Sequence, residues 1–273
     1  MTRPPKILVF DSGLGGLTVF AEIAKLRPHA DFVYCADDAN FPYGGWAEAA
    51  LIGVVGEVMA RLVADHAPDM IVIACNTAST LVLPSLRARW PQLPFVGTVP
   101  AIKPAAERSR SHMISVLATP GTVARDYTQK LIAQFAGHCA VTLVGSKHLA
   151  MLAEAQMRGE PVADADVARE ITPCFVEMDG ARTDAVVLAC THYPLLVESF
   201  RRLAPWPVDW IDPAPAIARH ADHLLRERFG ADAPRKETPH EVAPLRRAVF
   251  TSGRAPGAPL AMTLEKFGLK HFG

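Results

Sequence analysis

Two of the five cysteines in this chain stand in closely matching surroundings. Cys75 ends the segment IVIAC and is followed by Asn and Thr, whereas Cys190 ends VVLAC and is followed by Thr and His. A lone cysteine is more often a small buried hydrophobe than a reactive group, but the shared context favours a chemical function for this pair. The remaining cysteines, which are Cys35, Cys139 and Cys174, lack that context and are predicted to be structural.

Several kinds of chemistry use two thiols, and the sequence argues against most of them. A redox pair usually forms a Cys-x-x-Cys unit, which the chain lacks. A zinc site could be assembled from Cys75, Cys190, His192 and Asp11, but no close ligand spacing supports it, so no metal is expected. A single cysteine nucleophile with His192 as base would leave the other cysteine without a role. Proton transfer on both faces of one carbon uses both thiols, which indicates racemisation or epimerisation.

Two glycine-containing segments could contact a ligand beside the cysteines. In DSGLGG, Asp11 is expected at the carboxyl end of a strand, and Ser12 and the glycines lead into a helix N-terminus that can bind a carboxylate. Thr18 stands where a dinucleotide fingerprint needs its third glycine, and the chain has no Gly-Lys-Ser/Thr of a P-loop. The segment FPYGG places Tyr43 and Gly44 in an irregular loop after the next strand. Taken alone, either segment is equally well explained as an ordinary turn.

The cysteines and these loops follow short apolar runs that alternate with helical patterns. Strands are expected at 6–11, 31–36, 69–75, 95–98, 112–119, 140–145, 184–190, 208–212 and 248–253. Their apolar runs are continuous rather than alternating, which is typical of parallel strands covered on both faces by helices. The segment 164–178 is expected to be helical, and 230–247 is predicted to be a loop or a hairpin insertion. The alternation predicts an α/β fold with two doubly wound units of roughly 100 residues each.

Composition narrows the class of protein further. The 273 residues include 28 acidic and 28 basic side chains, so neither nucleic acid nor an anionic membrane surface is expected as a partner. The longest apolar runs are strand-sized, which argues against a membrane span, and the run before Asp11 is too short for a secretory signal. Five cysteines without the dense spacing of a disulfide scaffold indicate reduced thiols and a cytoplasmic protein. The sequence is compatible with a homodimer.

Four motifs give the chain a resemblance to a known family. DSGLGG, FPYG, ACNTAST and ACTHYPLL, in this order and spacing, resemble the cofactor-independent glutamate racemases of the aspartate/glutamate racemase superfamily, and FTSG near the C-terminus is also similar. The resemblance covers essentially the whole chain. It implies an isomerase that interconverts L-glutamate and D-glutamate without a cofactor and supplies D-glutamate for peptidoglycan, cell-wall biogenesis and cell shape.

The resemblance also implies how the chain is divided. Two doubly wound α/β domains with mainly parallel sheets would face each other across the active site, and each would contribute one cysteine. The first domain would comprise 1–98 together with 207–273, and the second would comprise 99–206.

Site residues follow by matching the family's motifs to this sequence. Cys75 and Cys190 would be the two acid/base groups, with Asp11 and His192 as helpers of the thiols. Binding of the small-molecule substrate glutamate is implied for Asp11, Ser12, Tyr43, Gly44, Asn76, Thr77, Thr191 and His192. The sequence departs from the family pattern at 38–40, where an Arg often precedes FPYG, and at 145–149, where the family often has an apolar run containing proline.

Two alternatives stay open beside a glutamate racemase. One is a racemase or isomerase of the same superfamily that acts on aspartate, a hydantoin or maleate. The other is a binding protein without enzymatic activity, in which two lobes close on a small acid. The presence of both thiols disfavours the second alternative.

Overall fold

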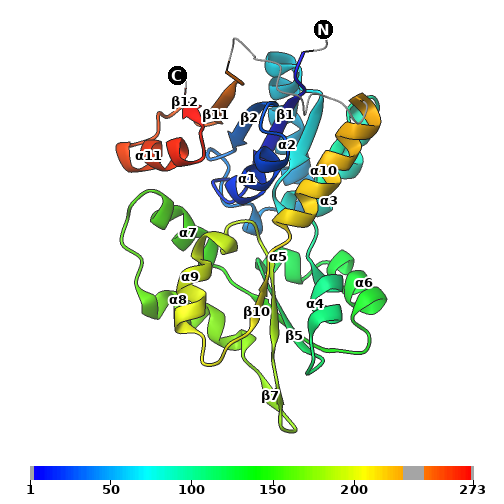
Figure 1. Cartoon of the computed structure of the whole chain (residues 1–273), viewed down its shortest axis with the longest axis vertical. Coiled ribbons are helices and arrows are strands. Elements are labelled where there is room, and N and C mark those ends of the chain that lie inside the picture. Colours follow the sequence, from blue (N-terminus) through cyan, green and yellow to red (C-terminus); the bar gives the residue numbers. More distant parts are fainter. Residues whose placement is uncertain (1–2, 230–242, 272–273) are drawn as a thin grey trace.

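The protein forms two α/β lobes, shown in Figure 1 as a computed structural model that describes residues 3–229 and 243–271. The upper lobe in that view contains both ends of the described chain, and the lower lobe contains its middle. Every strand pair in the two main sheets is parallel. The predicted fold of two doubly wound units is therefore confirmed.

The first lobe is built on a six-stranded sheet with the order β12-β11-β2-β1-β3-β4. Its strands are β1 (Lys6–Asp11), β2 (Asp31–Ala36), β3 (Met70–Ile73), β4 (Phe95–Gly97), β11 (Arg246–Phe250) and β12 (Lys270–His271). Its helices are α1 (Leu17–Leu26), α2 (Glu48–His66), α3 (Asn76–Arg89), α10 (Ala214–Phe229) and α11 (Ala258–Lys266). One apolar cluster lies between the sheet and α1, α10 and α11, and a second lies on the opposite face beneath α2 and α3. This double cover explains why β3 and residues 7–10 of β1 are apolar throughout.

The second lobe has a four-stranded sheet with the order β10-β9-β5-β6. Its strands are β5 (Met113–Ala118), β6 (Ala140–Gly145), β9 (Ala185–Ala189) and β10 (Asp209–Ile211). Its helices are α4 (Ile102–Arg108), α5 (Pro120–Val123), α6 (Asp126–Phe135), α7 (Leu149–Met157), α8 (Asp164–Ile171) and α9 (Val197–Leu203). Short 3-10 turns, η1 (Tyr43–Gly45), η2 (Thr172–Cys174) and η3 (Tyr193–Leu196), complete the two lobes.

The expected strands are found within one or two residues of their predicted bounds, except that β11 ends three residues before the predicted 253. The expected helix over 164–178 is wrong. Helix α8 ends at Ile171, just before Pro173, which restricts the residue that precedes it and cannot extend a helix. An antiparallel hairpin, β7 (Glu177–Met178) and β8 (Ala181–Arg182), then follows. Its turn is Asp179–Gly180, and both residues have positive φ, which is the pattern of a two-residue hairpin loop.

The chain passes between the lobes twice. It leaves the first sheet after β4 and reaches the second through α4, and it returns after β10 to α10. Because β10 pairs with β9, the strand at 209–211 belongs to the second sheet, although a first-domain segment was expected from 207 onward. We propose that the second domain extends through Ile211. Of the expected loop at 230–247, the part at 230–242 lies outside the described residues.

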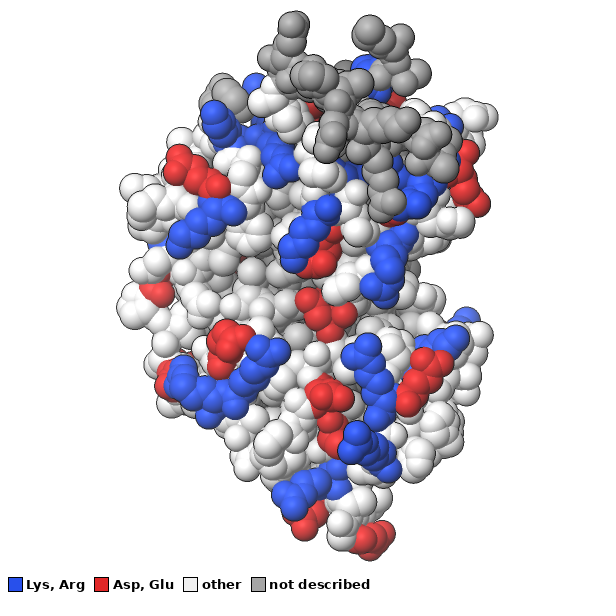
Figure 2. All heavy atoms as spheres, viewed as in Figure 1, with Lys and Arg blue, Asp and Glu red and all other residues white. Residues whose placement is uncertain are grey.

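The surface carries mixed charge. Figure 2 shows lysine and arginine side chains interspersed with aspartate and glutamate over the viewed face of both lobes. Among the helices of the described residues, none combines the length and the apolar character needed to cross a bilayer.

Candidate active site

Strand pairing places the two cysteines at corresponding ends of their sheets. Cys75 lies two residues beyond β3 and directly precedes α3, next to β1, because Phe10 and Ile73 are register partners. Cys190 directly follows β9 at the carboxyl end of the second sheet. Both side chains are buried. The carboxyl ends of parallel strands are where open α/β sheets bind ligands.

A small cavity between the lobes brings most of the predicted residues together. It is lined by Ser12, Phe41, Pro42, Tyr43, Gly44, Cys75, Asn76, Thr77, Thr119, Ala150, Cys190, Thr191 and His192. All predicted site residues except Asp11 are in this lining, so the two cysteines reach one cavity from opposite lobes. The cavity measures about 20 Å³, which is room for roughly one water molecule. This space is too small for an amino acid.

Asp11 lies behind the cavity and organises the glycine loop. Its Oδ2 accepts hydrogen bonds from the backbone N–H groups of Gly13 (3.3 Å) and Gly16 (2.9 Å). Its Oδ1 is buried and has no hydrogen-bond partner among the described residues. Burial raises the pKa of Asp11, and the charge of His192 partly offsets that rise. The carboxyl group is therefore held behind the cavity by the backbone of the glycine loop.

The environment of Cys75 favours a protonated thiol. Its Sγ lies 3.8 Å from Oγ of Ser12. Burial raises the pKa of Cys75 well above the ordinary thiol value, and the charge of Asp11 adds to the rise. A backbone hydrogen bond from Ala78 opposes this shift. Removal of Cys75 from water thus favours its neutral thiol form.

Cys190 faces a different set of groups. Nδ1 of His192 lies 3.8 Å from its Sγ, and Nε2 of His192 lies 2.9 Å from Oε1 of Glu154. Burial alone lowers the pKa of His192, but the hydrogen bonds to Cys190 and Glu154 outweigh it, so this pKa is raised well above its ordinary value. The raised pKa favours the protonated imidazole, which places a positive charge 3.8 Å from Sγ of Cys190.

Glu154 is a site residue that sequence reasoning missed. It lies on α7, is buried, and accepts hydrogen bonds from the backbone N–H of Leu14 (2.5 Å) and from Nη2 of Arg158 (2.7 Å). Burial raises the pKa of Glu154, but the hydrogen bond and the charge of His192 outweigh this effect. The pKa of Glu154 is therefore lower than its ordinary value. The sequence signal was slight, because an acidic residue four positions before an arginine is common on helices.

Glycines allow the first lobe to approach these groups closely. A Cβ at Gly13 would lie 2.2 Å from Oε1 of Glu154, and one at Gly15 would lie 2.5 Å from Nδ1 of His192. Real Cβ atoms do not approach other atoms so closely, so both positions require glycine. The loop DSGLGG therefore packs directly on the His192–Glu154 pair of the opposite lobe.

The remaining predicted residues differ in whether their polar atoms already have hydrogen-bond partners. Both amide atoms of Asn76 are buried and have no partner among the described residues. Oγ1 of Thr77 lies 3.2 Å from Oγ1 of Thr119 across the lobes. Tyr43, in contrast, donates its hydroxyl hydrogen to Asp37, so this donor already has a partner. Buried polar atoms without partners are rare in folded proteins, which makes Asn76 well suited to bind a polar ligand.

The two departures from the family pattern have hydrogen bonds of their own. In the 38–40 segment, the carboxylate of Asp38 accepts hydrogen bonds from the backbone N–H and the hydroxyl of Ser252. In the 145–149 segment, Oγ of Ser146 accepts a hydrogen bond from the backbone N–H of Leu149 (3.0 Å) at the start of α7. The same Oγ also accepts from the backbone N–H of His148 (3.3 Å), the residue that precedes the helix that carries Glu154.

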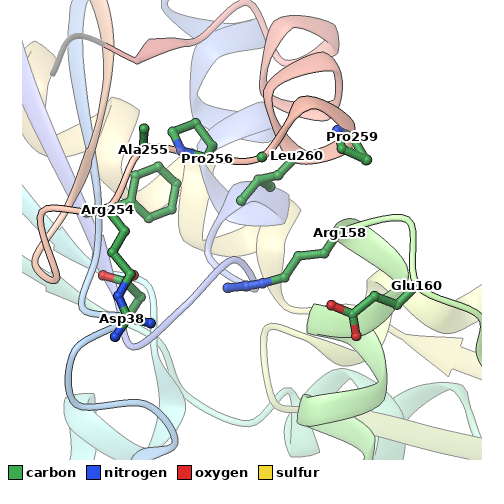
Figure 3. A pocket seen from close by; sticks show the side chains of 10 residues that line it. Asp38, Arg158, Glu160, Arg254, Ala255, Pro256, Pro259 and Leu260 are labelled. Carbon is green, nitrogen blue, oxygen red and sulfur yellow. The ribbon is translucent and has the colours of Figure 1, made fainter.

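A larger cavity of about 430 Å³ lies outside the catalytic one, between the end of α7 and the segment that leads into α11. Figure 3 shows the side chain of Arg158 extending into it, opposite Asp38 and Arg254. The same guanidinium binds Glu154. The hydrogen-bonded chain from Cys190 through His192 and Glu154 therefore ends at this outer cavity.

Comparison with known proteins identifies a family and relatives that match most of the chain. Residues 19–221 match the model of the Asp/Glu/Hydantoin racemase family. The chain is 57% identical over 269 residues to a glutamate racemase of Sinorhizobium medicae, covering 98% of this chain and 96% of that one. It is 58% identical over 266 residues to a glutamate racemase of Brucella anthropi, covering 97% and 92% respectively.

A solved structure matches the fold of the whole chain. This structure is the glutamate racemase of Escherichia coli in complex with L-glutamate and the activator UDP-MurNAc-ala. It superposes with a TM-score of 0.86 at 36% sequence identity, covering 98% of this chain and 97% of that chain.

Proposed function

This chain belongs to the Asp/Glu/hydantoin racemase family and, within it, to the glutamate racemases, and we propose that it interconverts L-glutamate and D-glutamate through two opposed cysteines. The observation that carries the proposal is that Cys75 and Cys190 line one cavity from opposite lobes. A proton can then leave one face of the α-carbon while another arrives at the opposite face. The E. coli relative, whose structure contains L-glutamate, supports the choice of substrate.

The chemical obstacle is the low acidity of the α-proton. A pyridoxal cofactor would provide an electron sink, but the sequence carries no cofactor motif, so protein groups have to stabilise the developing charge. Ser12, Asn76 and Thr77 from the first lobe, with Thr191 from the second, can donate hydrogen bonds to the α-carboxylate as charge builds on it. The unpartnered amide of Asn76 is the strongest support for this role. Closure of the lobes strengthens these contacts by excluding water.

The number of protons is conserved in both directions of the racemisation. With L-glutamate, the Cys190 thiolate takes the α-proton, and the Cys75 thiol gives its proton to the opposite face of the carbanion. The product is D-glutamate, and the two sulfurs have exchanged protonation states. With D-glutamate, Cys75 takes the proton and Cys190 delivers one. His192, held by Glu154, acts on Cys190, and Asp11 acts on Cys75.

The high identity to glutamate racemases favours glutamate over the other substrates of the superfamily. We further propose that the D-glutamate formed is used for peptidoglycan synthesis in the cytoplasm. Aspartate, hydantoin and maleate are the substrates against which specificity has to be measured.

The deciding experiment follows the α-hydrogen. The purified protein is incubated in D₂O, without added cofactor, with each glutamate enantiomer, and circular dichroism and α-deuterium content are recorded. Loss of optical activity with deuterium in the product is expected from either enantiomer. Cys75→Ala and Cys190→Ala should each lower racemisation by several orders of magnitude, whereas Cys139→Ala, at a thiol outside the cavity, should retain it. Near-normal turnover in either catalytic variant would reject the two-cysteine scheme.

A further inference from the structure

A cluster of metal-binding side chains lies at the far end of the second lobe from the proposed active site. His112, His138 and Cys139 each offer a ligand atom, and these three atoms lie within 4.8 Å of one another. The two imidazole rings have centroids 5.5 Å apart and planes inclined by 76°. Both histidines are exposed and Cys139 is half-buried, so an ion in solution can reach them. The two-cysteine mechanism uses none of these groups.

Strand register explains why these residues meet although they are far apart in sequence. β5 and β6 are parallel neighbours, and Met113 is the register partner of Ala140. His112 and Cys139 immediately precede those partners, so they lie side by side at the amino ends of the two strands. The backbone N–H of Ala140 donates to the carbonyl of His112 at 2.7 Å, which joins the two chain segments at this point.

The backbone on both sides of the cluster is held in place. The carboxylate of Asp184 accepts hydrogen bonds from Oγ of Ser109 (2.6 Å) and from the backbone N–H groups of Arg110 (2.7 Å) and Ser111 (2.9 Å). These contacts fix the loop that enters His112, whose φ of 55° is left-handed. On the other side, the N–H of Cys139 donates to the carbonyl of Ala136 at 2.9 Å. Only the side chains therefore need to move to bind an ion.

The ligand types select the kind of ion. Imidazole and thiolate suit zinc and neighbouring transition metals, whereas magnesium and calcium prefer oxygen ligands. Zinc–nitrogen distances near 2.0–2.1 Å and zinc–sulfur distances near 2.3 Å place tetrahedral ligand atoms roughly 3.5 Å apart. The three ligand atoms, which lie within 4.8 Å of one another, can reach this separation after small rotations of the exposed imidazoles. Three protein ligands would leave the fourth position to water.

We propose that His112, His138 and Cys139 form a binding site for Zn²⁺ or a similar thiophilic divalent transition-metal ion. Binding replaces the proton of the Cys139 thiol by the metal ion and releases that proton to solvent. The ion would join the beginnings of β5 and β6 and so stabilise the second lobe. The site lies at the amino ends of strands whose carboxyl ends face the catalytic cavity, roughly 20 Å away along six residues of β5. It should therefore raise thermal stability without changing racemisation.

The test needs a background in which the catalytic thiols cannot compete for metal. In the full chain carrying Cys75→Ser and Cys190→Ser, reduced and freed of metal by chelation, Co²⁺ is titrated and its absorption spectrum recorded. One equivalent should bind with a thiolate-to-cobalt charge-transfer band and tetrahedral ligand-field bands, and Zn²⁺ should displace it. No such band at stoichiometric Co²⁺ would overturn the proposal.

Single substitutions in that background identify the ligands. Cys139→Ser should remove the charge-transfer band, and His112→Gln and His138→Gln should each weaken Co²⁺ binding at least 10-fold. His148→Gln, at another exposed histidine of the same lobe, should bind as the parent does. Equal binding by both histidine variants would mean that the thiol alone captures the ion, which would overturn the site.

Thermal unfolding and turnover provide independent measurements. Zn²⁺ should raise the Tm of the background protein but not that of the His138→Gln variant, and the two proteins should have equal Tm values without metal. With both catalytic cysteines restored, metal-free His138→Gln should racemise glutamate at the parental rate. A Zn²⁺-dependent rise in Tm that persists in His138→Gln would contradict the assignment.

Discussion

Nε2 of His192 lies 2.9 Å from Oε1 of Glu154, and this buried pair sits directly beside Cys190. The relationship gives the two cysteines unequal surroundings. Cys75 has a buried carboxyl group and a serine near it, whereas Cys190 has an imidazole held by a carboxylate. Substitutions on either side should therefore affect the two directions of the reaction differently, which the following predictions use.

Glu154→Gln should slow the proton transfer at Cys190. The neutral amide no longer raises the pKa of His192, so less imidazolium is available to stabilise the thiolate, and kcat/KM should fall by about 10²-fold. Because the two enantiomers are equally stable, kcat/KM has to remain equal in both directions. The primary isotope effect should rise with α-deuterated L-glutamate and fall with α-deuterated D-glutamate. Shifts of the same sign with both labelled enantiomers would contradict the assignment of Glu154 to Cys190.

Gly15→Ala should damage the site through a steric clash. The new methyl group would lie 2.5 Å from Nδ1 and 2.6 Å from the backbone nitrogen of His192. Relief of this overlap should cost about 1–3 kcal/mol of stability, and displacement of His192 should lower kcat/KM by about 10²-fold. Gly53→Ala, on α2, is the matched control, since none of the described atoms lies within 4 Å of its Cβ position. Urea unfolding and steady-state kinetics on both variants measure the difference, and similar results for the two would reject the packing argument.

The His192–Glu154 pair should make stability depend on pH in a defined direction. The pKa of His192 is raised by folding, so its contribution is complete below the ordinary value of 6.5 and is lost as pH rises through the folded value. The pKa of Glu154 is lowered by folding, so its contribution is complete above 4.5 and is lost as pH falls through the folded value. Both contributions are present between 4.5 and 6.5.

A comparison with His192→Gln isolates the histidine. The difference in unfolding free energy between the parent and this variant should be largest in that window and should shrink as the solution is made alkaline. Urea titrations at several pH values provide the measurement. A difference that stays constant or grows toward alkaline pH would show that folding does not raise the pKa of His192.

An ion pair across the lobes should assist closure slightly. Nη1 of Arg125, beyond α5, lies 2.9 Å from Oε1 of Glu48, at the start of α2. Glu48 is 69% exposed, so water screens the pair, and its contribution should be at most about 1 kcal/mol. Glu48→Gln should raise the KM for glutamate by less than about fivefold, and added salt should remove the effect.

A second exposed pair serves as the control. Glu57 lies 3.8 Å from Arg89 entirely within the first lobe, so Glu57→Gln should leave KM unchanged at every salt concentration. A larger effect for Glu57→Gln than for Glu48→Gln would exclude a specific role of the Arg125 pair in closure.

The sequence was sufficient to predict the fold and the gathering of most site residues. Cys75, Asn76 and the DSGLGG loop follow parallel strands, and parallel strands bring the segments after their carboxyl ends to one edge of a sheet. Glu154 could not be predicted in this way, because it lies within a helix and its distance from His192 depends on how α7 packs against η3 within the second lobe. The engaged hydroxyl of Tyr43 depends likewise on the buried position of Asp37.

Two further features of the second lobe differ in how clearly the sequence indicates them. Asp179–Gly180 is a strong hairpin signal, but the helix predicted over 164–178 covers β7, the first strand of that hairpin. The cluster of His112, His138 and Cys139 carried no motif at all, since its members meet only through the pairing of β5 with β6.

The pairing of β2 with β11 has a consequence for synthesis on the ribosome. β2 lies near the beginning of the chain and β11 near its end, so the outer edge of β2 stays open until translation is almost complete. The strands of the second lobe, from β5 to β10, are contiguous in sequence and can pair earlier. An open parallel edge can join other nascent chains. The growing polypeptide should therefore depend most on chaperones in the interval between the emergence of β4 and the arrival of β11, and ribosome-bound chains arrested in that interval should aggregate more readily than full-length protein.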